Sequence, residues 1–144
     1  MVRRRHWGVD HWGWYMIAQA LEDLWAITPD PRRDRLAAAF VTHTVALATG
    51  VSPSEIASVG RTSKAAARAR QIAIYLAHVN FNWPLLRVAL AFNRDRTTCG
   101  HACHRIEDMR ENAAFDAQMN ALDACVKQAP DTIPDLTCHQ GARR

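Results

Sequence analysis

A short turn between two helical patterns is the feature that most constrains this chain. Apolar residues recur at helical spacing over residues 85–92 and again over residues 99–109, with only Asn93-Arg94-Asp95 in the turn between the two helices. Aspartate is favoured at a helix N-cap, so Asp95 predicts that the second helix begins at Arg96. Two helices joined by so short a turn are typical of a helix-turn-helix unit.

Further helices are predicted on both sides of this unit. Asp30-Pro31 opens a helix that runs to Thr49, Ser52-Pro53-Ser54-Glu55 forms a capping box for a short one, and helical spacing returns over residues 64–79. No segment shows the alternation typical of a strand. We therefore expect an all-α fold, a compact multi-helix domain containing the helix-turn-helix, with an extra N-terminal helix and a C-terminal helical extension.

The same spacing predicts which residues are buried and how the chain divides. The expected interior residues are, in chain order, Leu36, Phe40, Thr44, Leu47, Ile72, Ala73, Leu76, Val79, Phe115, Met119, Leu122 and Val126. We expect a Trp-rich arm and helix over residues 1–29, the domain that contains the helix-turn-helix over 30–112, and a helix with a tail over 113–144. Periodicity leaves open whether the last helix prolongs the one from Arg96 or is separate.

Positive charge is concentrated in the middle of the chain. Residues 61–110 hold nine Lys/Arg against three Asp/Glu, whereas residues 1–60 hold six of each and residues 111–144 hold three against five. A basic segment attracts polyanions by counterion release, and here it coincides with the helix-turn-helix. The plainer interpretation is a solvated basic face without a partner.

Composition argues against several other classes of protein. The sequence has no apolar run of about 18 residues and no leader-like start, so we expect a cytoplasmic, nucleoid-associated protein without a membrane partner. Cys99 and Cys103 share the apolar stripe of their helix, which favours buried thiols over a zinc site, although His101 and His104 lie nearby. We expect no metal, no cofactor and no enzymatic activity.

Two sequence blocks resemble a known family. The pattern Arg-Asp-x-Thr-Thr-x-x-His-Ala-Cys-x-x-Ile-Glu over residues 94–107, preceded by Ala-Arg-Ala-Arg-Gln-Ile-Ala-Ile-Tyr-Leu-Ala over residues 67–77, resembles the C-terminal duplex-binding domain of the DnaA replication initiators. The similarity runs from about Phe40 to Glu111. The sequence has no Gly-rich loop ending in Gly-Lys-Ser/Thr, so we expect the domain to act without the initiators' ATPase module.

The resemblance implies a set of DNA contacts. It places Asp95, Arg96 and Thr97 at base-reading positions and Thr98 at a phosphate, and arginine stands at Arg96 where the family usually has histidine. It also places Thr62 where the family has a minor-groove arginine, with Arg61 adjacent. The remaining expected contacts are Ser63, Lys64, Pro84, Leu85, Arg94 and His101. Gly100, which replaces a larger residue, is expected to let the backbone approach DNA closely.

Several functions remain open from the sequence. The leading hypothesis is a bacterial transcriptional regulator that binds double-stranded DNA with sequence preference. An alternative is a replication modulator that competes for initiator boxes, and another is a protein-interaction module that has lost DNA binding. The Trp-rich segment, with Arg3-Arg4-Arg5 beside a repeated His-Trp-Gly, could contact a protein partner or a second copy, or enter a minor groove.

Overall fold

The computed structural model describes residues 27–128, which contain helices and turns and no strand. The predicted all-α fold is therefore confirmed. The Trp-rich arm, most of the N-terminal helix predicted within residues 1–29 and the tail beyond residue 128 lie outside the described residues. None of the helices within residues 27–128 is long and apolar enough to span a membrane.

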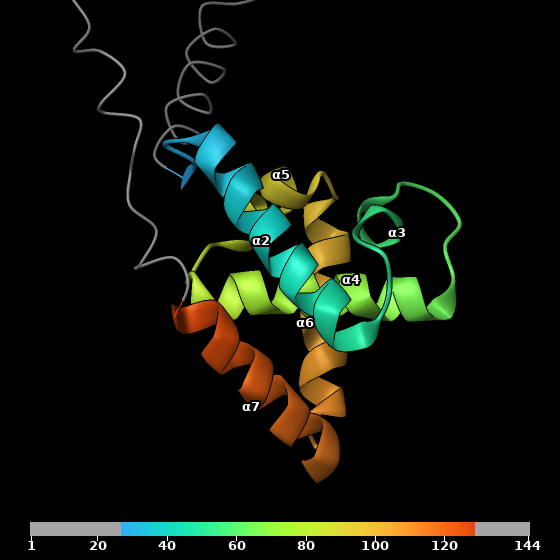
Figure 1. Cartoon of the computed structure of the whole chain (residues 1–144). Coiled ribbons are helices and arrows are strands. Elements are labelled where there is room, and N and C mark those ends of the chain that lie inside the picture. Colours follow the sequence, from blue (N-terminus) through green and yellow to red (C-terminus); the bar gives the residue numbers. More distant parts are fainter. Residues whose placement is uncertain (1–26, 129–144) are drawn as a thin grey trace, which may run out of the picture.

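Helix α4 (Lys64–Asn80) lies at the centre of the domain. Helix α2 (Pro31–Thr49) crosses it on one side and α6 (Arg96–Met109) packs against the other, as Figure 1 shows. Every residue of α4 from Ile72 to Ala77 is buried, as expected for a helix covered on all sides. Four buried alanines on α4, at positions 66, 69, 73 and 77, leave room for its neighbours to approach closely.

The predicted helix boundaries agree with the structure because local capping sets them. Asp30 accepts a hydrogen bond from the amide of Arg33 at 3.1 Å, and α2 ends at Gly50, whose φ of 71° is left-handed. Ser52 caps the short α3 (Pro53–Ala57). Helix α5 (Leu85–Phe92) follows α4 after a break at residues 81–84.

The predicted buried face of α2 was wrong for Leu36 and Leu47, whereas Phe40 and Thr44 are half-buried. Leu36 and Leu47 are 65% and 89% exposed, and the buried residues are Asp34, Ala38, Val41, Thr42, Val45 and Ala46. The small and β-branched residues on this face fit against the alanine-rich α4, and Asp34 can be buried because it binds Arg87 of α5. Val79 of α4, also predicted inside, is 45% exposed.

The last helix is separate from α6. Helix α7 (Ala113–Gln128) begins after a turn at residues 110–112, where the Asn112 side chain accepts a hydrogen bond from the Phe115 amide at 3.1 Å. Met119 and Val126 of α7 are fully buried in the same core as α4. The division predicted at residue 112 thus falls at a turn, and the core continues across it.

Arg110 fastens α7 to α4. Its guanidinium donates hydrogen bonds to Asp116 at 2.6 Å, Asn120 at 2.5 Å and Asp123 at 3.3 Å on α7, and to the Tyr75 hydroxyl at 3.2 Å on α4. Burial alone lowers the pKa of Arg110, but the bonds to Asp116 and Tyr75 raise it overall. This network fixes the turn between α6 and α7.

Candidate nucleic-acid interface

The turn between α5 and α6 is closed by backbone hydrogen bonds. Asn93 ends α5 with a left-handed φ of 52°, which asparagine tolerates better than most residues. The Arg94 amide donates to the Ala89 carbonyl at 2.9 Å, so the chain reverses within two residues. Asp95 is extended and α6 begins at Arg96, as the sequence predicts.

The first turn of α6 projects its side chains into solvent. Asp95, Arg96, Thr97 and Thr98 are all exposed. The Asp95 carboxylate stands at the N-cap position without making the usual side-chain capping bond. Within residues 27–128, the side chains of Arg96, Thr97 and Thr98 form no hydrogen bond or ion pair with the protein. These four groups are therefore free to bind a ligand.

The upstream junction divides into exposed and structural residues. Arg61 and Lys64 are exposed. Ser63 caps α4 by accepting a hydrogen bond from the Ala66 amide at 3.1 Å, and the Thr62 hydroxyl lies 3.4 Å from a guanidinium nitrogen of Arg70. Of the four residues predicted to contact DNA here, Thr62 and Ser63 thus have partners within the fold, and Ser63 is nevertheless exposed like Arg61 and Lys64.

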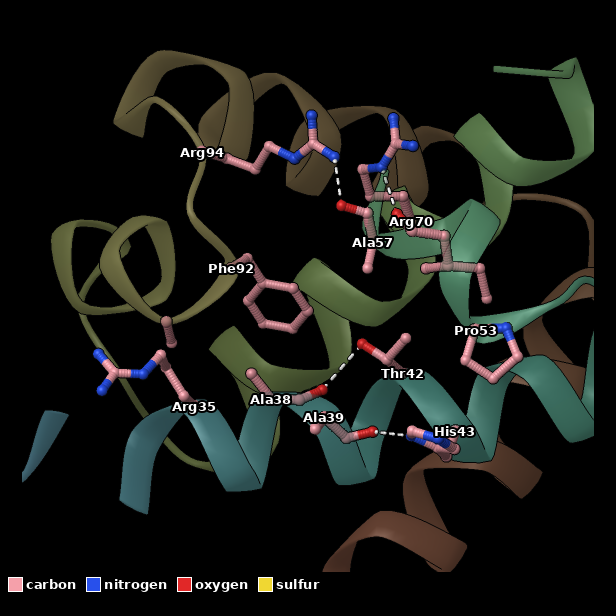
Figure 2. Close-up of a pocket in the computed structure, with 12 residues that line it drawn as sticks. Arg35, Ala38, Ala39, Thr42, His43, Pro53, Ala57, Arg70, Phe92 and Arg94 are labelled. Atoms are coloured by element: carbon pink, nitrogen blue, oxygen red, sulfur yellow. Dashed lines mark hydrogen bonds between the residues drawn. The ribbon is translucent and has the colours of Figure 1, made fainter. Parts of the chain in front are cut away.

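Arg70 and Arg94 both bind the C-terminal end of α3. Arg70 donates to the Ile56 carbonyl at 2.6 Å, so its guanidinium has a partner within the fold. Arg94, predicted to contact DNA, donates to the Ala57 carbonyl at 3.3 Å and to the Ser58 carbonyl. Figure 2 shows both guanidiniums directed at this end of α3.

A shallow groove of about 540 Å³ lies on the surface between α4 and α6. Thr98, His101 and Arg105 line one wall, and Gln71 of α4 lines the other. Arg105 was not among the predicted contacts. Its spacing from Thr98 and His101 is the helical repeat that puts all three on one face, so the sequence already placed Arg105 beside two expected contacts.

Comparisons with known proteins agree with this geometry. Residues 38–106 match the family model described as the bacterial DnaA protein helix-turn-helix. Over these residues the chain has the fold of a DnaA-type helix-turn-helix domain. The match includes α5, the turn, and α6 as far as Ile106.

Two solved structures share the fold of this DnaA-type domain. One is described as a DNA replication initiation factor, with a TM-score of 0.62 and 24% identity over 78% of this chain and 37% of that chain. The other is described as the replication initiator DnaA bound to AMPPCP and single-stranded DNA, with a TM-score of 0.60 and 23% identity over 84% of this chain and 34% of that chain. The chain therefore matches little more than a third of each initiator chain.

Pro84 and Leu85 begin α5 of the DnaA-type domain. Pro84 is exposed, whereas Leu85 is half-buried and points at α6. A Cβ added at Gly100 would lie 3.7 Å from Leu85 Cδ1. The side of Gly100 that lacks a side chain thus faces α5, which favours a role in helix packing over the expected approach of DNA backbone.

The two cysteines of α6 belong to the core. Cys99 is fully buried and Cys103 is 6% exposed. Burial raises the pKa of each thiol to about 11, so both are protonated and uncharged at neutral pH. Among the described residues, no three His, Cys, Asp or Glu side chains are grouped so that they could hold a metal ion. The thiols act here as small apolar side chains.

Proposed function

We propose that this protein binds double-stranded DNA with sequence preference, by placing the first turn of α6 in a major groove, and that it acts as a bacterial transcriptional regulator. The observation that carries the proposal is the exposed, unbonded state of the side chains from Asp95 to Thr98. An N-terminal turn with free polar groups is the part of a recognition helix that reads base edges.

The chemistry of these side chains suits base pairs. A carboxylate such as Asp95 accepts from cytosine N4, an arginine such as Arg96 donates twice to guanine, and a threonine methyl such as that of Thr97 packs on a thymine methyl. Thr98, one residue further, has a free hydroxyl for a phosphate. We infer that Arg96 gives the site a preference for guanine.

Backbone contacts would come from the surrounding cationic and polar groups. Lys64 and Arg61 are exposed beside the start of α4, and His101 lines the groove between α4 and α6 with Arg105. Such groups fix the position of a protein on the duplex without reading its sequence. We infer that one DNA strand follows this groove while Pro84 and Leu85 flank the sugar-phosphate chain.

A replication role is the second candidate. The likeness to initiator structures favours it, since a protein with this domain could occupy sites that initiators use. The preferred sequence distinguishes the two roles. A selected site equal to an initiator box indicates competition at origins, and an unrelated site found in promoters indicates transcriptional control.

Selection from a random duplex pool, followed by fluorescence anisotropy with the full chain, tests the proposal. We expect the selected duplex to bind at least tenfold more tightly than a scrambled duplex, with affinity that falls steeply as salt rises. Equal affinity for the two duplexes would contradict sequence preference. No affinity for either duplex at low salt would instead favour the protein-interaction module.

A further inference from the structure

Several carbonyls at the C-terminal end of α3 accept hydrogen bonds from side chains elsewhere in the fold. Ser58, at the C-cap, is extended with φ −63° and ψ 143°, so the chain leaves the helix without the left-handed turn that satisfies helix carbonyls. Two arginines take the place of that turn. Arg70 of α4 binds the carbonyls of Glu55, Ile56 and Ser58 at 2.6–3.1 Å.

Arg94 supplies the second set of bonds from the turn before α6. Its guanidinium donates to the carbonyls of Ala57 and Ser58, so the Ser58 carbonyl is shared by both arginines. The shared carbonyl brings the two cations close together, and burial, and next the charge of Arg94, lower the pKa of Arg70. Two like charges are tolerated there because several carbonyl oxygens surround them.

The same contacts fix the loop that follows, residues 58–62, which we call the Arg61 loop. Arg70 and Arg94 hold its first residue, and Arg70 also lies beside the hydroxyl of its last, Thr62. Between these anchors Val59 is 76% exposed, Gly60 has a φ of 130° and Arg61 is exposed. Arg61 is therefore presented from a loop that is held at both ends.

We propose that Arg94 is a positioning residue that, together with Arg70, holds the Arg61 loop in register with the first turn of α6, without itself touching DNA. The inference rests on the proposed function. If Arg94 holds the loop in this way, the Arg61 loop and the first turn of α6 form one preformed surface. The two segments then need not be ordered separately when they bind the same duplex, which lowers the entropic cost of binding.

A double-mutant cycle tests whether Arg94 acts through the loop. The variants are Arg61→Ala, Arg94→Ala and their combination, measured against a fluorescein-labelled duplex from the random-pool selection. We expect Arg61→Ala to weaken binding by about tenfold in the wild-type background and by less than about twofold beside Arg94→Ala. Additive effects of the two substitutions would mean that Arg94 contacts DNA on its own, and would overturn the proposal.

Two further variants separate position from charge and from folding. Arg35→Ala removes an exposed arginine that lines the same pocket as Arg94. We expect this substitution to leave the effect of Arg61→Ala on DNA affinity unchanged. Arg94→Lys keeps the charge but loses the forked donors, and replaces Arg94→Ala if that variant does not fold. We expect it to uncouple Arg61 as alanine does. The proposal would be overturned if Arg94→Lys bound DNA with wild-type affinity. It would also be overturned if Arg35→Ala reduced the effect of Arg61→Ala on DNA affinity.

Amide hydrogen exchange, measured without DNA, tests whether Arg94 anchors the Arg61 loop independently of whether the protein binds DNA. We expect Arg94→Ala to speed exchange at Gly60 and Arg61 and to leave α7 unchanged. Unchanged exchange in the Arg61 loop would refute the positioning role even if DNA binds. Faster exchange in a protein that binds no duplex would instead refute the proposed function and keep the anchoring of the loop.

Discussion

Arg87 of α5 donates two hydrogen bonds of 2.8 Å to the carboxylate of Asp34 in α2, a residue 53 positions earlier in the sequence. The Asp34 side chain is 4% exposed, and the Arg87 guanidinium also stacks 4.5 Å from the centroid of the Trp83 ring. This arrangement ties the first helix of the helix-turn-helix to the helix that opens the domain. A two-pronged contact of this kind suits arginine better than lysine.

We predict that Asp34→Asn lowers the free energy of unfolding by about 2 to 4 kcal/mol. The substitution leaves the Arg87 charge without its anion in a largely buried place, and the 24% exposure of Arg87 keeps the cost below that of a fully buried pair. Urea unfolding measures the change. Glu111→Gln, an equivalent substitution at an exposed acid, is the control and should stay within about 0.5 kcal/mol. An equal change in both variants would show that the pair contributes little.

Gly100→Ala should stabilise the protein by about 0.5 to 1 kcal/mol. Alanine restores helix propensity inside α6, and its methyl group meets Leu85 at an ordinary contact distance of 3.7 Å. Thermal unfolding followed by circular dichroism gives the comparison. Because the new methyl group points at α5, DNA affinity should be unchanged. A loss of affinity in a stabilised variant would place Gly100 against DNA after all.

The buried thiols predict a pH dependence of stability. Burial raises the pKa of Cys99 and Cys103 from 9.0 to about 11. Between these values the unfolded chain loses thiol protons that the native protein keeps, so stability falls as pH rises, by about 1 to 2 kcal/mol per thiol. Urea unfolding at several pH values in this window measures the slope. The double variant Cys99→Ala/Cys103→Ala should have a flatter slope, and an identical slope would exclude the thiols as its cause.

Local signals explain why helix starts were predictable and buried faces were less so. Asp30, Ser52 and Asp95 mark helix starts through their own chemistry, and the structure places the starts there. The buried side of α2 depends on which helix it meets. The burial of Asp34 beside Arg87, with Leu36 left exposed, cannot be read from periodicity.

In the candidate site, too, features set by the local sequence were predictable and contacts between distant residues were not. Exposure of Asp95 through Thr98 follows from the position of the apolar stripe on α6, and the structure agrees. Their contacts with DNA stay a prediction. The bonds of Arg94 to Ala57 and Ser58 join residues 37 and 36 positions apart, so the sequence pattern gave no sign that this arginine binds α3.

The binding of Arg96→Ala and Lys64→Ala to a set of duplexes with single base-pair changes tests the central claim most directly. If the first turn of α6 reads bases, Arg96→Ala should lose about 1 to 3 kcal/mol of discrimination at one base pair, whereas Lys64→Ala should weaken every duplex alike. Lys127→Ala, at an exposed lysine of α7, should change neither. Discrimination that survives Arg96→Ala at every position would contradict the placement of this helix in the major groove.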